Sequence, residues 1–248
     1  MSSPAIPPAA PALLKIVLLL ANATCTYYGM KPPTPVARPE ERAKAKSDSL
    51  GRLWTPKVMV TLAYPLRGAL CGIAAIEAAA LLVQQLPPPV SARLLATLPG
   101  LTVSGLSLTP LFLVGSAMAI VGGTIRMVCH RALGRFFTWQ MAIQEGHKLI
   151  TTGPYSFVRH PSYSGWLLLV LGKALAVLGP GSYYVQSGLS QTRIGQTAAG
   201  AVFGYLAVVT YILCRRINKE DSDLSKEFGE EWRAWAKKTP YKLIPFVY

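Results

Sequence analysis

The residues best suited to chemistry lie in one run, Gly153–Gly165, directly before a long apolar segment. The run contributes a guanidinium, an imidazole and two phenols from Arg159, His160, Tyr155 and Tyr163. A proline at each end of residues 155–160 breaks the helix there and leaves backbone polar groups free to face a ligand. A cluster of this kind at the end of a membrane helix can hold a charged ligand beside a lipid-soluble one.

A second polar cluster, Arg216–Asp221, follows the next apolar segment. If that helix continues, Arg216 and Glu220 are i,i+4 neighbours on one face. Arg216 then offers a planar fork to a carboxylate, and Glu220 offers an anion to an amine or to ribose hydroxyls. An ordinary surface ion pair at the end of a membrane helix has the same spacing, so this segment by itself leaves both interpretations open.

Aromatic side chains gather around the first cluster. His147 precedes it, and Tyr155, His160 and Tyr163 lie within it. Aromatic faces attract cations by about 0.5–2 kcal/mol, and these rings also carry hydrogen-bonding groups. The group would therefore suit a purine, a ribose and a sulfonium cation.

The composition places these residues in a membrane protein. The chain is 51% hydrophobic and 15% charged, whereas a soluble domain has about 25% charged residues. About 20 apolar residues are needed to cross a bilayer. Five segments meet this length or come close to it: Pro11–Gly29, Val58–Gln84, Leu108–Val128, Tyr163–Leu178 and Gly195–Cys214. Proline and glycine clusters separate them without an alternating strand pattern, so we expect an all-α fold.

The basic residues predict the orientation of the chain. Of the 25 lysines and arginines, 20 fall in the loops 31–57, 126–159 and 215–242, and only Arg93 and Arg193 face the other side. This asymmetry is typical of cytoplasmic loops. The net charge of +14 is thus a signal of topology with some attraction to membrane lipids, and it does not indicate nucleic-acid binding.

Other patterns give weaker signals. The four cysteines show no C-x-x-C spacing, so we expect neither a metal site nor a redox dithiol. Glu77, Arg67 and Lys173 are charges inside predicted spans; such residues mark either function or pairing within the bundle. The tail Glu227–Tyr248, with aromatic and lysine residues interleaved, fits an interfacial anchor that also covers the pocket.

Taken together, the motifs resemble the isoprenylcysteine carboxyl methyltransferases, membrane enzymes that methylate the C-terminal prenylated cysteine of processed CaaX proteins. The matching pieces are His147–Ile150, Gly153–Tyr155, Arg159–Gly165, the Arg216…Glu220-Asp221…Leu224 spacing, Phe228–Trp232 and Ile244–Phe246. They run from Phe136 to the end of the chain. The sequence departs from the family at Asp221, where a second Glu is usual, and at Trp232, where Tyr is frequent.

The resemblance implies a fold and a site. It implies an all-α integral membrane protein of about five transmembrane helices, in the endoplasmic reticulum, with S-adenosyl-L-methionine as cofactor. A cytoplasmic-face pocket would form from the loop between spans three and four and from the C-terminal segment. Residues 1–128 would hold three spans and the cytoplasmic linker 31–57, and residues 129–248 the catalytic region. The cofactor contacts implied are Gln140, His147, Lys148, Leu149, Ile150, Tyr155, His160, Pro161, Ser162, Tyr163 and Glu220, with Arg216 as the catalytic residue that approaches the substrate.

The substrate implied is the α-carboxylate of a prenylated C-terminal cysteine on a protein or peptide. Such a carboxylate is ionised at neutral pH, because its pKa is about 3.3–3.7, so the reaction needs no general base. The alternative is an N-methyltransferase that acts on a phosphatidylethanolamine-type lipid, whose substrate would leave Arg216 without a carboxylate to bind. A scaffold or transporter without enzymatic activity gives no reason for the clustered His, Tyr and Arg residues.

Overall fold

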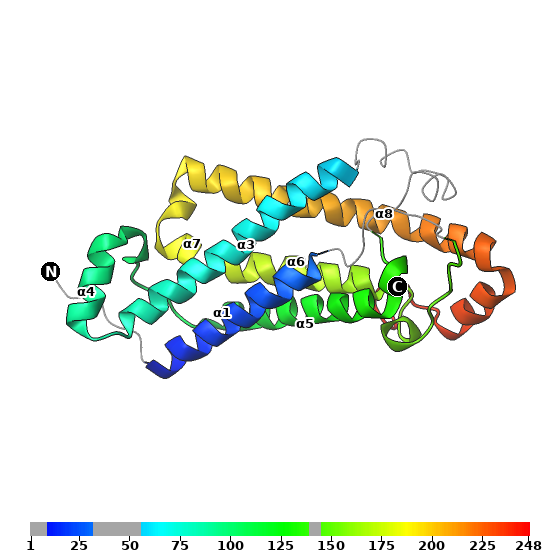
Figure 1. Ribbon diagram of the computed structural model, residues 1–248, viewed down its shortest axis with the longest axis horizontal. Coiled ribbons are helices and arrows are strands. Elements are labelled where there is room, and N and C mark those ends of the chain that lie inside the picture. The colour runs from blue at the N-terminus through cyan, green and yellow to red at the C-terminus, as the bar shows by residue number, and fades with distance from the viewer. Residues whose placement is uncertain (1–8, 32–55, 139–144) are drawn as a thin grey trace. The chain divides into compact units, whose positions relative to one another are not determined.

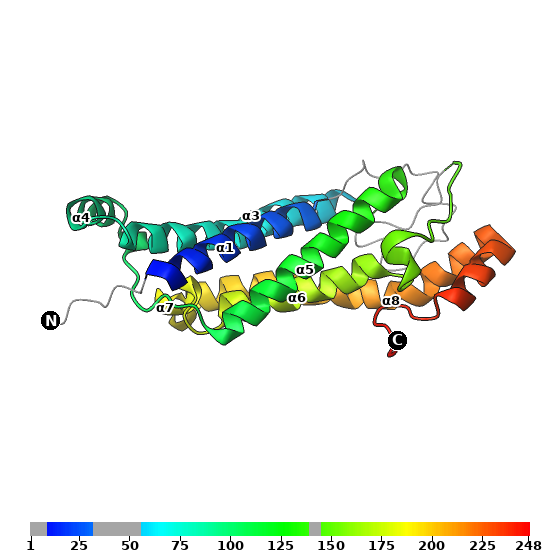
Figure 2. The same cartoon turned by 90° about the horizontal axis from the view of Figure 1, so that it is seen from below.

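The computed structural model describes residues 9–31, 56–138 and 145–248, and its regular elements in these ranges are helices (Figures 1 and 2). The longer helices are α1 (Ala9–Gly29), α3 (Pro56–Gln84), α4 (Pro88–Thr97), α5 (Pro110–Leu133), α6 (Pro161–Leu178) and α8 (Arg193–Lys238), and α7 (Tyr183–Gln186) is a single turn. Within the described ranges, five helices are long and apolar enough to cross a membrane. The prediction of an all-α membrane protein with five spans is confirmed.

The first four spans begin and end close to their predicted limits, but the fifth does not. The apolar run ends near Cys214, whereas α8 continues to Lys238. Hydropathy marks where a helix leaves an apolar environment and not where it ends, since Glu, Lys and Arg are themselves good helix formers. The second polar cluster therefore lies on a helix.

Helix α8 contains a sharp change of direction at Gly229. This residue has φ 52° and ψ −118°, which a residue with a Cβ adopts only at a cost. The segment after Gly229, the red end of α8 in Figure 1, folds away from the segment before it. The turn directs the Trp232–Lys238 segment to new neighbours.

The chain forms two compact units. Unit 1 contains Met1–Tyr27, Leu66–Val121 and Leu168–Leu206, and unit 2 contains Tyr28–Pro65, Gly122–Leu167 and Ala207–Tyr248. In unit 1, a Cβ at Gly115 would lie 2.8 Å from the carbonyl oxygen of Gly172. In unit 2, a Cβ at Gly165 would lie 2.7 Å from that of Gly122. Helices α5 and α6 thus approach closely in each unit because glycine removes the side chain at the contact.

Unit 1 holds a closed buried ion pair. The Lys15 Nζ lies 2.5 Å from Glu77 Oε1 and donates to the carbonyl oxygens of Ser107 and Gly181 at 2.8 and 2.7 Å. The second oxygen of Glu77 accepts from the backbone N–H of Tyr183 at 3.0 Å. These contacts tie together α1, α3, the segment before α5 and the turn between α6 and α7, so Glu77 is paired within the bundle.

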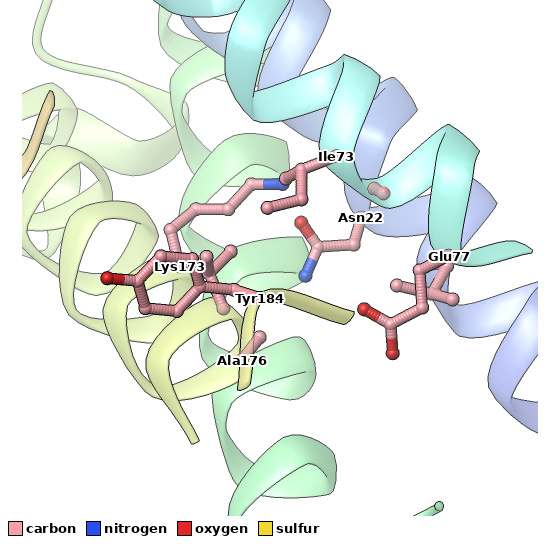
Figure 3. Close-up of a pocket in the computed structure, with 9 residues that line it drawn as sticks. Asn22, Ile73, Glu77, Lys173, Ala176 and Tyr184 are labelled. Carbon is pink, nitrogen blue, oxygen red and sulfur yellow. The ribbon is translucent and has the colours of Figure 1, made fainter. Parts of the chain in front are cut away.

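The other two predicted intramembrane charges also lie in unit 1. Arg67 lies over the Tyr27 ring at 4.2 Å, and Lys173 is 2% exposed and donates to the Leu70 carbonyl at 3.4 Å. Lys173 borders a small cavity that Asn22, Glu77 and Tyr184 also line, as Figure 3 shows. Apart from its ends, the predicted linker 31–57 lies outside the described residues.

Candidate active site

The loop before α6 and the C-terminal tail pair through their backbones in unit 2. The amides of Arg159 and His160 donate to the carbonyls of Tyr241 and Lys242 at 2.9 and 2.8 Å. The Arg159 guanidinium also donates to the carbonyls of Thr239 and Pro240 at 3.0 and 2.9 Å. The tail therefore holds the Arg-His-Pro motif in place from one side.

Two carboxylates of helix α8 contact the Arg-His-Pro motif and the tyrosine that follows it. Tyr163 Oη donates to Glu220 Oε2 at 2.6 Å. Asp221 Oδ1 lies 3.0 Å from His160 Nε2. Its other oxygen, Oδ2, accepts a hydrogen bond from Arg159 Nη2 at 3.1 Å. The two stretches that the sequence analysis assigned to one site are thus in contact, although 57 residues separate Tyr163 from Glu220.

The two adjacent carboxylates have different surroundings. The Asp221 side chain is 10% exposed and both its oxygens are engaged, so it clamps the motif. The Glu220 side chain is 29% exposed and lies 3.8 Å from Arg216 Nη2, one turn before it on α8. Because Glu220 is more open and more loosely paired, it is the carboxylate that can accept a ligand. The shorter Asp at position 221, a departure from the family pattern, faces Arg159 and His160.

An aromatic group stands beside Glu220. The His147 ring stacks on Phe136 at 4.7 Å and meets Phe228 edge-on at 5.7 Å. Burial lowers the pKa of His147 below its ordinary value, although Glu227 and Glu220 act in the opposite direction. The imidazole is therefore neutral at pH 7.

Several buried polar atoms of unit 2 have no hydrogen-bond partner among the described residues. Among them are His147 Nδ1, Trp232 Nε1 and Asp223 Oδ2. Buried polar atoms are normally satisfied, and these are a ring nitrogen, a donor and a carboxylate oxygen. Atoms of these kinds can bind a polar ligand.

Other predicted contacts form the support beneath this group. Tyr155, 7% exposed, packs with Cys129 and Trp235, and Leu149 and Ile150 lie against the same cluster. The Tyr155 carbonyl accepts from Trp235 Nε1 at 3.1 Å. Burial raises the pKa of the Tyr155 phenol far above its ordinary value, so it stays protonated. Trp235 was predicted as part of an interfacial anchor; the structure buries it, because the turn at Gly229 brings it back onto the loop.

The remaining predicted residues have separate positions. Pro161 begins α6, as its fixed φ favours, and Ser162 is 6% exposed and bonded to Arg126. Lys148 is exposed. Gln140 lies outside the described residues.

Sequence reasoning missed Arg126 as a site residue. The charge count places it in a cytoplasmic loop, whereas the structure buries it on α5 at 5% exposure. Its position inside the predicted span Leu108–Val128 was the available signal, since a buried charge in a span has a reason to be there.

The similarity to known proteins includes the part of the chain that contains the loop before α6. Residues 115–196 match the model of the isoprenylcysteine carboxyl methyltransferase (ICMT) family. No solved structure matches the chain.

Curated relatives agree with that match. A probable protein-S-isoprenylcysteine O-methyltransferase of Oryza sativa subsp. indica is 30% identical over 54% of this chain and 61% of its own length. Protein-S-isoprenylcysteine O-methyltransferase B of Arabidopsis thaliana is 30% identical over 54% of this chain and 58% of its own.

Similarity to this chain is not confined to methyltransferases. A Delta(14)-sterol reductase of Mus musculus is 27% identical over 42% of this chain and 20% of its own length. The chain spans less than two thirds of the length of the relatives it matches. Residues 115–196, which contain the loop and α6, are therefore similar to the isoprenylcysteine carboxyl methyltransferase family.

Proposed function

We propose that this protein transfers a methyl group from S-adenosyl-L-methionine to the C-terminal carboxylate of a prenylated cysteine on a protein or peptide. The observation that carries the proposal is the contact of Tyr163 with Glu220 beside the buried Arg216. This contact joins the two family motifs into one group of side chains. Glu220, the carboxylate that we assign to the cofactor, lies one helical turn from Arg216.

Arg216 is the residue suited to the substrate. It is 9% exposed, and a guanidinium in a dry environment binds a carboxylate through two parallel hydrogen bonds. The substrate carboxylate is already ionised, so Arg216 has to orient it and need not remove a proton. Exclusion of water favours the step, because an anion and a sulfonium become two neutral groups.

The cofactor, when bound, supplies an electrophilic methyl group. Glu220 and the Tyr163 phenol are placed to hold its hydroxyl or amine groups, and the rings of His147, Phe136 and Phe228 can accommodate its flat base. These residues position two reactants, and positioning alone can contribute several kcal/mol, up to about 7–11 in the best intramolecular cases.

The location is part of the proposal. The 20 basic residues on one side put the site and the C-terminus at the cytoplasmic face, and the family resemblance indicates the endoplasmic reticulum. Residues 1–128 would then supply membrane spans, and residues 129–248 the catalytic region.

The test is an assay with two acceptors. Purified protein in detergent would receive labelled S-adenosylmethionine with a farnesylcysteine analogue or with phosphatidylethanolamine. We expect a base-labile methyl ester on the farnesylcysteine analogue only. Methylation of the phospholipid amine would establish the alternative N-methyltransferase, and labelling of neither acceptor would reject both activities.

A matched pair of variants tests the role of Arg216. Arg216→Ala should abolish methyl transfer while cofactor binding, measured by calorimetry, largely survives. Arg215→Ala, the exposed neighbour on α8, should keep both. An equal loss of transfer and cofactor binding in Arg216→Ala would place Arg216 on the cofactor side.

A further inference from the structure

We infer that Arg126 is a positioning residue for cofactor binding, which it supports by holding the first turn of α6; this inference rests on the proposed function. Its Nη1 donates to the carbonyl oxygen of Ser162 at 3.0 Å and to the Ser162 hydroxyl at 3.1 Å. Both oxygens of the residue before Tyr163 are thus bound to one guanidinium. That guanidinium lies 5.2 Å from the centre of the Trp166 ring, one turn further along α6.

The second anchor of Arg126 is the end of another helix. Its Nε donates to the carbonyl oxygen of Gly29, the last residue of α1, at 2.5 Å. A helix end leaves such carbonyls without an intrahelical partner and carries partial negative charge. Arg126 therefore joins the end of α1 to the start of α6 through α5, with Nε on one acceptor and Nη1 on the other.

The side chain has little freedom to leave this position. A Cβ at Gly165 would lie 3.0 Å from Arg126 Cγ and 3.1 Å from Ile125 Cγ2, so α6 packs directly against the stem of the arginine. The titratable groups near the guanidinium are Cys129, Tyr163, Tyr155 and His130. No carboxylate is among these, so Arg126 keeps its contacts to backbone oxygens.

The position of Ser162 affects the next residue along α6. Tyr163 follows Ser162, and its hydroxyl reaches Glu220 at 2.6 Å. Hydrogen bonds of this kind lose strength when the donor moves by a few tenths of an ångström or turns away from the acceptor. Loss of the Arg126 anchor would let the start of α6 shift, and the Tyr163–Glu220 pair would no longer be set for the cofactor.

The first experiment replaces the fork but keeps the charge. Arg126→Lys in the full-length protein has one nitrogen in place of the Nε and Nη1 that bind Gly29 and Ser162. We expect its dissociation constant for S-adenosylmethionine, measured by calorimetry, to rise roughly tenfold, as for one lost charged hydrogen bond. The KM for the cofactor should rise with it, while kcat at saturation and the melting temperature stay near those of the wild type. Arg131→Lys, an exposed arginine on the same helix, should change nothing.

A double variant distinguishes positioning from general support. Tyr163→Phe should weaken cofactor binding too, and Arg126→Lys combined with Tyr163→Phe should bind no more weakly than Tyr163→Phe alone, because Arg126 acts through Tyr163. Additive losses, or unchanged binding in Arg126→Lys, would overturn the inference, as would a fall in melting temperature with normal affinity. The wild type separates the two claims: if it binds no S-adenosylmethionine, the proposed function fails; if it binds and Arg126→Lys binds equally well, only the role of Arg126 fails.

Discussion

Each unit contains a glutamate bound to a cation, but the two pairs differ in closure. In unit 1, the Lys15 and Glu77 side chains are 1% and 5% exposed and 2.5 Å apart. In unit 2, Arg216 and Glu220 are 11% and 29% exposed and 3.8 Å apart. Backbone groups complete the first pair, whereas a tyrosine hydroxyl reaches the second.

This difference distinguishes a charge pair that supports the fold from one that we propose to bind a ligand. A buried ion pair offsets its desolvation only with good geometry and with its remaining polar atoms satisfied, and Lys15–Glu77 meets both conditions. The looser pair keeps binding capacity that a ligand can use. Burial of a charge in a span is therefore not a sign of function by itself, and the completeness of its partners decides the interpretation.

The largest expected effect is the loss of stability when the Lys15–Glu77 pair is broken. Glu77→Ala leaves the Lys15 charge buried without its partner and should lower the free energy of unfolding by about 3–5 kcal/mol. Lys15→Met combined with Glu77→Leu should recover most of this loss, since no charge remains. Unfolding in mixed micelles gives the measurement, and Arg93→Met, at an exposed site on α4, is the control. Full stability of Glu77→Ala would show that the pair does not hold unit 1 together.

Removal of the charge on Glu220, in the open pair, should weaken cofactor binding and leave stability nearly unchanged. Glu220→Gln keeps the shape and removes the charge, so cofactor affinity should fall about 10- to 100-fold, the equivalent of about 1.5–3 kcal/mol for a charged hydrogen bond, with little loss of stability. Calorimetry and melting temperature report the two quantities. Glu231→Gln, exposed on the same helix, should leave both unchanged. A stability loss as large as that of Glu77→Ala would make Glu220 structural and remove the contrast between the units.

The turn in α8 should have an intermediate effect. Gly229→Ala places a Cβ in open space but at φ +52°, and we expect a loss of about 1–2 kcal/mol in unfolding free energy from backbone strain alone. Gly204→Ala has the same open surroundings without positive φ and should be neutral or stabilise by about 0.5–1 kcal/mol. Equal results for the two variants would mean that the turn at Gly229 is relaxed.

The smallest effect concerns pH. Burial lowers the pKa of His147 in the folded state, so on acidification the unfolded chain takes up a proton near pH 6.5 while the folded chain does not. The stability of the wild type should therefore be complete above this pH and decrease below it. His147→Phe should lack that part of the decrease, and melting curves from pH 7.5 to 5.5 would test it. Parallel curves for the two proteins would indicate that the imidazole titrates normally.

Much of the site could be predicted from local patterns. The i,i+4 spacing of Arg216 and Glu220 required only that the helix continue, and α8 does continue. The predicted fifth span ended at Cys214 because it rested on hydropathy, whereas the helix itself continues through the charged residues to Lys238. The clamp of Asp221 on Arg159 and His160 had no local signal, since its partners lie about 60 residues away.

The amino-acid sequence alone was enough to predict the class of the protein: its apolar spans, the concentration of its basic residues in three segments, and the residue types that gather around the loop before α6. These follow from transfer of side chains between water and lipid and from helical periodicity, which are local properties. Only the tertiary structure decided which carboxylate clamps and which stays open, and that Arg126 and Trp235 lie inside. Those choices depend on the approach of backbones at Gly165 and the turn at Gly229, where distant segments compete for the same partners.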